Sequence, residues 1–297
     1  MTLVARLSTL LIVLLLAGCS QEKVQVIEGS IYGTTYSVQF TENVDKEKIH
    51  TLIKAELDRI DMVFSTYKPS SEISLINDCR KNWDQEYPDF NPIFDEENEV
   101  YKCANSLGSR EFNDLLKRAD KFLFITDGAF HAADENVVFV NGYLPWDFSA
   151  IGKGYAVDKI SELLVKNGIV NYFIDIGGEL SINGTKFSEL WTWGVNNPFN
   201  VNSGAYRAFS APKNGISIAT SGEYRNPGHI WGAGVRDAVS VTVIDDNATD
   251  ADAWATAMYV LGIQKGLKIA EKEGLAVFFI KNDGKSVNSS EWSKIYP

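Results

Sequence analysis

The sequence lacks the motifs of several common hydrolase classes and has few residues that could replace them. It contains neither a G-x-S-x-G nucleophile elbow nor an H-E-x-x-H zinc motif, and only three His and three Cys occur in 297 residues. Serine, thiol and zinc hydrolases therefore find no support. Basic residues are also a minority, with 28 Lys and Arg against 39 Asp and Glu. Nucleic-acid binders contact phosphates through Lys and Arg, so the net charge of −11 excludes that class.

The overall composition is that of a globular protein. Hydrophobic residues make up 45 % and charged residues 23 % of the chain, which excludes disordered, collagen-like and coiled-coil proteins. There is no internal repeat, low-complexity stretch or clean linker, so residues 31–297 are expected to form one domain. Strand patterns outnumber helix patterns, and the turns between them are short. These features predict an α+β fold, with largely antiparallel sheets packed against helices.

The amino terminus has the pattern of an export signal. Residues 10–16 form an apolar run that is too short to span a bilayer and that follows Arg6. The ending Leu16-Ala17-Gly18-Cys19 resembles a bacterial lipobox, in which Cys19 becomes the lipid-modified first residue. An ordinary signal with a chance Cys19 is the alternative. We expect a signal peptide at 1–18, a polar tether at 19–30, and an exported lipoprotein that is anchored to a membrane and faces the periplasm.

The other two cysteines are an even pair in an oxidising compartment. This predicts a disulfide between Cys79 and Cys103, with two reduced thiols as the alternative. Residues 78–112 are rich in Pro, Asn and acidic side chains without clear periodicity. We therefore expect an inserted loop there, which the disulfide would hold in place.

Hydrophobic periodicity predicts the regular elements of the domain. Helices are expected at 45–64, 111–126, 155–167 and 250–272. Strands are expected at 31–40, 170–176, 179–182, 191–196, 216–219, 238–244 and 275–280.

The first candidate for chemistry is the segment 147–155, in which Gly152 and Gly154 flank Lys153 just before a predicted helix. Free backbone N–H groups, the positive end of the helix dipole and a lysine suit a phosphate group. The segment is not a Walker A loop, because the first glycine and the Ser or Thr after the lysine are missing. An ordinary turn into a helix is the alternative.

The second candidate is the segment 249–256, where Asp252 and Thr256 are four residues apart on one face of a predicted helix. A carboxylate and a hydroxyl, with a backbone carbonyl from elsewhere, are oxygen ligands suited to Mg²⁺. The alternative is a capping arrangement with Thr249 as N-cap and Asp252 at the third helical position.

The third candidate is the loop that follows Thr220-Ser221-Gly222 and contains His229. A histidine in a Gly- and Pro-rich loop is well placed for catalysis. A surface histidine without a catalytic role is the alternative.

Together these segments resemble the FAD:protein FMN transferase (ApbE) family of bacterial flavinyltransferase lipoproteins. The matching stretches run in the family's order over nearly the whole chain after the signal, at 33–36, 65–74, 126–130, 147–158, 175–178, 193–195, 220–222 and 251–256. The resemblance implies an enzyme that transfers FMN from FAD to a Thr or Ser hydroxyl of an exported partner protein and releases AMP with the help of Mg²⁺. The usual acceptor target is Ser/Thr-Gly-Ala-Ser/Thr.

The resemblance also implies roles for particular residues. The Mg²⁺ ligands would be Asp252, Thr256 and the backbone carbonyl of Ala150, and His229 would be the catalytic candidate near the reacting phosphate. The positions that bind FAD would be Tyr32, Tyr67, Ala129, Phe130, His131, Asp147, Lys153 and Ile230.

Some positions depart from the family pattern. His131 occupies a position that is usually Asp, and Tyr32 one that is usually Met. The run after His229-Ile230 is Trp231-Gly232-Ala233-Gly234 instead of a second aliphatic residue and Asp-Pro-x-Thr-Gly. Two alternative functions therefore stay open: a Mg²⁺-dependent FAD pyrophosphatase that uses water as the acceptor, and a flavin-binding lipoprotein without catalysis.

Overall fold

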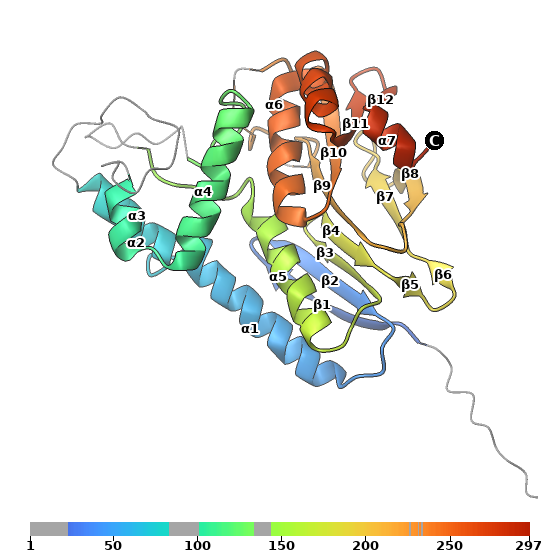
Figure 1. Cartoon of the computed structure of the whole chain (residues 1–297), viewed down its shortest axis with the longest axis horizontal. Coiled ribbons are helices and arrows are strands. Elements are labelled where there is room, and N and C mark those ends of the chain that lie inside the picture. Colours follow the sequence, from blue (N-terminus) through green and yellow to red (C-terminus); the bar gives the residue numbers. More distant parts are fainter. Residues whose placement is uncertain (1–22, 83–100, 134–143, 226, 231, 233) are drawn as a thin grey trace, which may run out of the picture.

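The computed structural model describes residues 23–82, 101–133, 144–225, 227–230, 232 and 234–297 (Figure 1). Its helices are Lys46–Phe64 (α1), Glu72–Lys81 (α2), Lys102–Leu107 (α3), Arg110–Ile125 (α4), Gly152–Lys166 (α5), Ala248–Glu273 (α6) and Ser290–Ile295 (α7). Its strands are Gln25–Ile31 (β1), Thr34–Phe40 (β2), Tyr172–Ile176 (β3), Glu179–Asn183 (β4), Thr185–Lys186 (β5), Glu189–Leu190 (β6), Thr192–Asn196 (β7), Ala205–Ser210 (β8), Ile216–Ser221 (β9), Ala238–Asp245 (β10), Ala276–Lys281 (β11) and Ser286–Asn288 (β12). In this part of the chain no helix is both long and apolar enough to cross a membrane.

A central antiparallel sheet organises the domain and confirms the predicted fold class. Eight strands pair in the order β1-β2-β3-β4-β9-β10-β11-β12, while β5-β6 and β7-β8 form two small hairpins. Helices α1, α5 and α6 cover one face, and the β7-β8 hairpin with α7 covers the other (Figure 1). Strand β11 has apolar side chains on both faces of the sheet, so both faces must be covered. Val277 and Phe279 pack on the helical side, and Phe278 and Ile280 pack on the other.

The first hairpin corrects the expected tether. Residues 25–30 of the expected tether at 19–30, together with Ile31, form the edge strand β1, which pairs with β2 from Gln25 opposite Phe40 to Ile31 opposite Thr34. The two strands meet at Tyr32-Gly33, which have φ angles of 53° and 72°. A two-residue turn of this kind requires positive φ at both positions. The strand was missed because only Ile27 of its side chains is buried, as is common at an edge.

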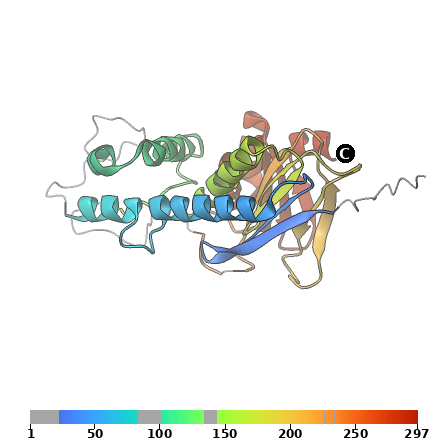
Figure 2. The ribbon, with the colours of Figure 1, turned by 90° about the horizontal axis from the view of Figure 1, so that it is seen from below.

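The prediction of an inserted loop at 78–112 is wrong for the part that the structure describes. Residues 78–81 belong to α2, 102–107 to α3 and 110–112 to α4. Helices α2 and α4 begin at serine caps, because Ser71 accepts the Ser74 amide and Ser109 accepts the Phe112 amide. Together α2, α3 and α4 form a helical lobe beyond the end of the sheet (Figure 2). The middle of the expected loop, 83–100, lies outside the described residues.

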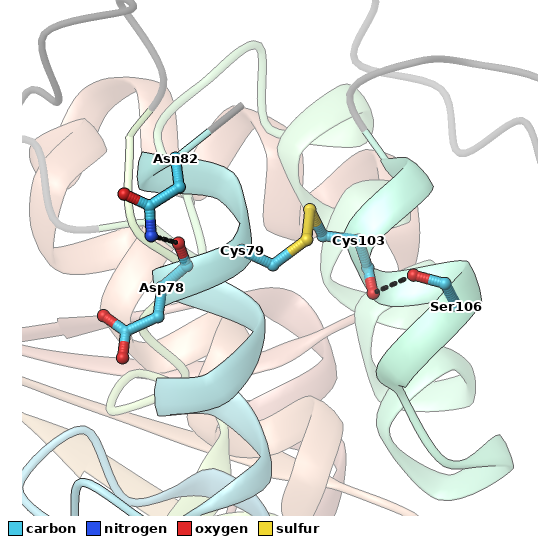
Figure 3. Close-up of a disulfide and its surroundings, with 5 residues drawn as sticks. All are labelled: Asp78, Cys79, Asn82, Cys103 and Ser106. Atoms are coloured by element: carbon cyan, nitrogen blue, oxygen red, sulfur yellow. Dashed lines mark hydrogen bonds between the residues drawn. A yellow bond between two sulfur atoms is a disulfide. The ribbon is translucent and has the colours of Figure 1, made fainter. Parts of the chain in front are cut away.

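A disulfide joins α2 to α3 through Cys79 and Cys103, which are 24 residues apart (Figure 3). Replacing both with serine should lower the free energy of unfolding by about 3 kcal/mol, because closing such a loop removes entropy from the unfolded chain. Urea denaturation of the double variant and the parent measures this difference. Thiol titration of the unfolded, unreduced protein provides a second test: it should find neither cysteine, and two reactive thiols would contradict the bond.

The remaining predicted elements agree in type with those observed. The helices predicted at 45–64, 111–126, 155–167 and 250–272 occur as α1, α4, α5 and α6. The strands predicted from residue 170 onward occur as β3, β4, β7, β9, β10 and β11. Strands β5, β6, β8 and β12 and helix α7 were not predicted.

Helix α4 carries a buried carboxyl group that predicts a pH-dependent stability. Asp120 is 5 % exposed, and burial raises the pKa of its carboxyl to about 7, although Tyr101 and Arg80 oppose the shift. Between about pH 4 and 7 the folded state therefore keeps this proton, whereas the unfolded state releases it. The contribution of Asp120 to the free energy of unfolding falls as the pH rises through this range. Relative to the Asp120→Asn variant, the parent should lose up to about 4 kcal/mol of stability over that range. Urea denaturation at several pH values measures this difference, and a constant difference would contradict it.

Candidate active site

Helices α5 and α6 pack directly against each other where each begins (Figure 1). A Cβ atom added to Gly154 in the first turn of α5 would lie 2.1 Å from the carbonyl oxygen of Ala248 and 2.8 Å from Cβ of Asp252. One turn later, the Asp158 carboxylate accepts hydrogen bonds from the backbone N–H groups of Ala248 at 2.8 Å and Thr249 at 2.9 Å. The start of α6 is therefore fixed on α5, and the contact requires glycine at position 154.

Asp252 points from α6 into this contact. Its side chain is buried at 2 % exposure, and its Oδ2 accepts the backbone N–H of Gly154 at 2.9 Å. The capping alternative for Asp252 is wrong, because the N-cap of α6 is Asn247, whose side chain accepts the amide of Asp250. Burial raises the pKa of Asp252, while Lys153 and the Gly154 amide oppose the shift.

Lys153 lies between two carboxylates. Its Nζ is 2.5 Å from Oε1 of Glu179 and 4.0 Å from Oδ1 of Asp252. Burial alone would lower the pKa of Lys153, but the carboxylates of Asp252 and Glu179 raise it above its ordinary value. Glu179 was not among the predicted site residues, although it directly follows the matching stretch 175–178. Its Oε2 is buried without a hydrogen-bond partner among the described residues.

Thr256 follows Asp252 by one helical turn, as predicted from their spacing. Its Oγ1 lies 3.3 Å from Oγ of Ser221, the last residue of β9. The noted segment 220–222 is therefore next to α6. Ala150 lies in the turn before α5, two residues ahead of Gly152. In the described part of the chain, no three His, Cys, Asp or Glu side chains gather around a possible metal position, and the predicted set contains one carboxylate.

Two further segments of the predicted FAD site lie side by side. The backbone N–H of Asp147 donates to the carbonyl of Ala132 at 3.1 Å, so the loop with Ala129 and His131 runs next to residue 147. The Oδ1 of Asp147 accepts the Ser149 amide at 2.8 Å, which shapes the turn into α5. Phe130 is fully buried, and its amide donates to Oγ1 of Thr126. The side chain of Phe130 is therefore part of the core.

Two other predicted FAD positions have surroundings that sequence patterns did not indicate. The hydroxyl of Tyr32 donates to the carbonyl of Leu57 on α1 at 3.0 Å, so this side chain is held against the helix. Tyr67 lies between α1 and α2 and is 95 % exposed.

The loop between β9 and β10 carries His229 and Ile230. Glu223 holds it, because its Oε1 accepts the amides of Gly228 at 3.1 Å and Ile230 at 3.4 Å. Arg236 donates to the carbonyl of Ile230 at 2.6 Å and pairs with Glu223 at 3.2 Å. The side chain of Ile230 is buried in the apolar cluster shared with α6, whereas His229 is exposed.

Comparison with known proteins fits this arrangement of segments. The sequence model of the ApbE family matches residues 32–145 and 141–279, which together make up most of the chain. The chain belongs to the ApbE family. This ApbE-family chain is 27 % identical over 315 residues to an FAD:protein FMN transferase of Salmonella typhimurium, with 88 % of this chain and 85 % of the relative covered. It is 25 % identical over 342 residues to an FAD:protein FMN transferase of Escherichia coli K12, with 95 % and 93 % covered.

Solved ApbE structures share the fold. The apo form of the Pseudomonas stutzeri flavinyl transferase ApbE superposes with a TM-score of 0.71 at 22 % identity, covering 93 % of this chain and 99 % of that one. The ApbE protein of Thermotoga maritima gives a TM-score of 0.72 at 21 % identity, covering 93 % and 100 %. This chain therefore shares its overall fold with these two solved structures.

Proposed function

We propose that the protein transfers FMN from FAD to a Ser or Thr hydroxyl of a partner protein, releases AMP and uses Mg²⁺. The names of the curated relatives support this class of reaction, and the sequences of these relatives align with this chain over most of both lengths. The observation that carries the proposal is the buried Asp252 beside the start of α5, with the Lys153 ammonium 4.0 Å away. A carboxylate for a metal ion and a cationic helix start for phosphates are what the pyrophosphate of FAD requires.

The residues at this contact fit a hard cation. Asp252 uses Oδ2 for the Gly154 amide, and its Oδ1 is 4.0 Å from the Lys153 ammonium, beyond hydrogen-bond distance, so Oδ1 can bind a metal. The buried carboxyl groups of Asp252 and Glu179 share the single positive charge of Lys153, and burial raises the pKa of Glu179 to about 8. When both groups are ionised, the site carries a net negative charge that a cation would offset. Asp252 Oδ1, Thr256 Oγ1 and the Ala150 carbonyl would hold the ion. A bound Mg²⁺ would neutralise charge on the transferring phosphoryl group.

In the transfer, the oxygen of the acceptor hydroxyl forms a bond to the phosphorus of the FMN half of FAD. The bond from that phosphorus to the bridging pyrophosphate oxygen breaks, and AMP leaves with the electron pair. The hydroxyl proton goes to a base, for which we propose His229, because the Glu223 contacts hold its loop in place. Lys153 would bind the phosphate oxygens, because the N–H groups of Gly152 and Gly154 already donate to the Phe148 carbonyl and the Asp252 carboxylate.

We further propose that the protein acts outside the cytoplasm. The lipobox-like ending at Cys19, which lies outside the described residues, supports attachment to a membrane that faces the periplasm. Strand β1 begins at Gln25, so the domain would lie close to its anchor.

The direct test uses the full chain, purified in detergent, with FAD and Mg²⁺. An acceptor protein with the Ser/Thr-Gly-Ala-Ser/Thr target is added or omitted, and an acceptor with alanine at the target hydroxyl is the control. We expect a fluorescent flavin band on the intact acceptor only, together with AMP. Release of AMP without a labelled acceptor would identify an FAD pyrophosphatase instead. Bound FAD with neither product would identify a flavin-binding protein without catalysis.

A further inference from the structure

Glu179 occupies a fixed position at the candidate active site, although the predicted site does not include it. It is the first residue of β4, after the two-residue turn Gly177-Gly178, and pairs with Ile176 of β3. Its side chain is 2 % exposed. The strand that carries the carboxylate lies in the middle of the sheet, where pairing with β3 and β9 fixes its position.

Glu179 and Asp252 compete for the same ammonium group. The Nζ of Lys153 is in hydrogen-bond contact with Glu179 at 2.5 Å but is 4.0 Å from Oδ1 of Asp252. Asp252 meanwhile binds the Gly154 amide through its other oxygen, Oδ2. Without Glu179, the partly exposed Lys153 ammonium would be drawn toward Asp252, because a buried carboxylate needs a positively charged or hydrogen-bonding partner. The ammonium would then block Oδ1.

We infer that Glu179 is a positioning residue that holds the Lys153 ammonium away from Asp252 and so keeps Asp252 Oδ1 available for a divalent cation. The inference rests on the proposed function, because it takes Asp252 as the metal ligand. It assigns a role to Glu179 that acts through Lys153 and not through contact with substrate or metal.

Binding of Mn²⁺ to the full chain without FAD tests this role apart from activity. Paramagnetic resonance of free Mn²⁺ gives the dissociation constant for the parent, Asp252→Asn, Glu179→Gln, Lys153→Met and the Glu179→Gln/Lys153→Met double variant. Ser181→Ala, at a buried polar position two residues along β4, is the matched control for disturbing the strand. Glu179→Gln should weaken Mn²⁺ binding at least tenfold, by roughly the strength of one charged hydrogen bond. In the Lys153→Met background, the Glu179→Gln substitution should change the dissociation constant for Mn²⁺ less than threefold. The Ser181→Ala variant should bind Mn²⁺ like the parent.

The outcomes separate the inference from the proposed function. If the parent does not bind Mn²⁺, or Asp252→Asn binds it equally well, the proposed metal site fails and the inference fails with it. If the parent binds, Asp252→Asn does not, and Glu179→Gln matches the parent, only the inference is overturned. An equal loss from Glu179→Gln in both backgrounds would show direct action on the cation and would also overturn it. If Glu179→Gln does not fold, Glu179→Asp replaces it. That variant keeps the charge and should bind within threefold of the parent, whereas a tenfold loss would contradict the role.

Discussion

Replacing Asp252 with asparagine should lower the rate of flavin transfer by a factor on the order of 10² to 10³, while the protein stays folded. The asparagine keeps an oxygen that can accept the Gly154 amide, so the contact between α5 and α6 survives. It removes the negative charge that would hold the cation and that lies 4.0 Å from the Lys153 ammonium. Asp252→Ala is a poorer test, because at this buried position it would leave the Gly154 amide without its acceptor.

Asp250→Asn is the matched control for this change. Asp250 lies two residues earlier in α6, but its Oδ1 pairs with Arg118 of α4 at 2.6 Å. The Asp250→Asn variant should therefore transfer flavin at nearly the parental rate. Initial rates of acceptor labelling across a range of Mg²⁺ concentrations compare the two variants. A fully active Asp252→Asn enzyme with unchanged Mg²⁺ dependence would refute the role of this carboxylate.

Replacing Gly154 with alanine should destabilise the protein by about 3 kcal/mol and abolish transfer. The added methyl group would lie 2.1 Å from the Ala248 carbonyl oxygen, which is backbone and cannot rotate away. Helices α5 and α6 would have to separate, and Asp252 would lose the Gly154 amide. Thermal and urea denaturation measure the stability, and the labelling assay measures the activity.

Gly152→Ala provides the comparison two residues away. A Cβ atom at Gly152 would meet no atom within 4 Å, and its φ is not in the left-handed region. Alanine there should leave the free energy of unfolding unchanged or raise it by about 0.5 kcal/mol, through its better helix propensity. Equal stability effects at positions 152 and 154 would contradict the close helix contact.

Much of the fold was predictable because amphipathic elements show their buried face in one stretch of sequence. In α1, Ile49, Ile53, Leu57 and Ile60 recur at helical spacing and are all buried. Strand β1 has only Ile27 to bury. Helix α2 begins at a serine cap, and a disulfide joins it to the six-residue helix α3, so neither helix shows a long apolar face. Short elements that are stabilised by distant contacts leave little periodicity to detect.

The same reason explains which parts of the site were predictable. Asp252 and Thr256 are one helical turn apart, so their spacing alone placed them together. Glu179 meets Lys153 across 26 positions, and Gly154 meets Asp252 across 98. No local pattern distinguishes a glutamate after a glycine turn that faces solvent from one that is buried against a partly exposed lysine. The pairing of β3 with β4 and the packing of α5 on α6 decide this.

The central claim is that the protein joins flavin covalently to another protein. The most direct measurement is the intact mass of the acceptor after incubation with FAD, Mg²⁺ and either the parent or Asp252→Asn. The account predicts that the parent adds the mass of one FMN residue, with AMP formed in equal amount, and that Asp252→Asn leaves the acceptor mass unchanged over the same time. An acceptor of unchanged mass with the parent enzyme, while FAD is bound or hydrolysed, would contradict the account.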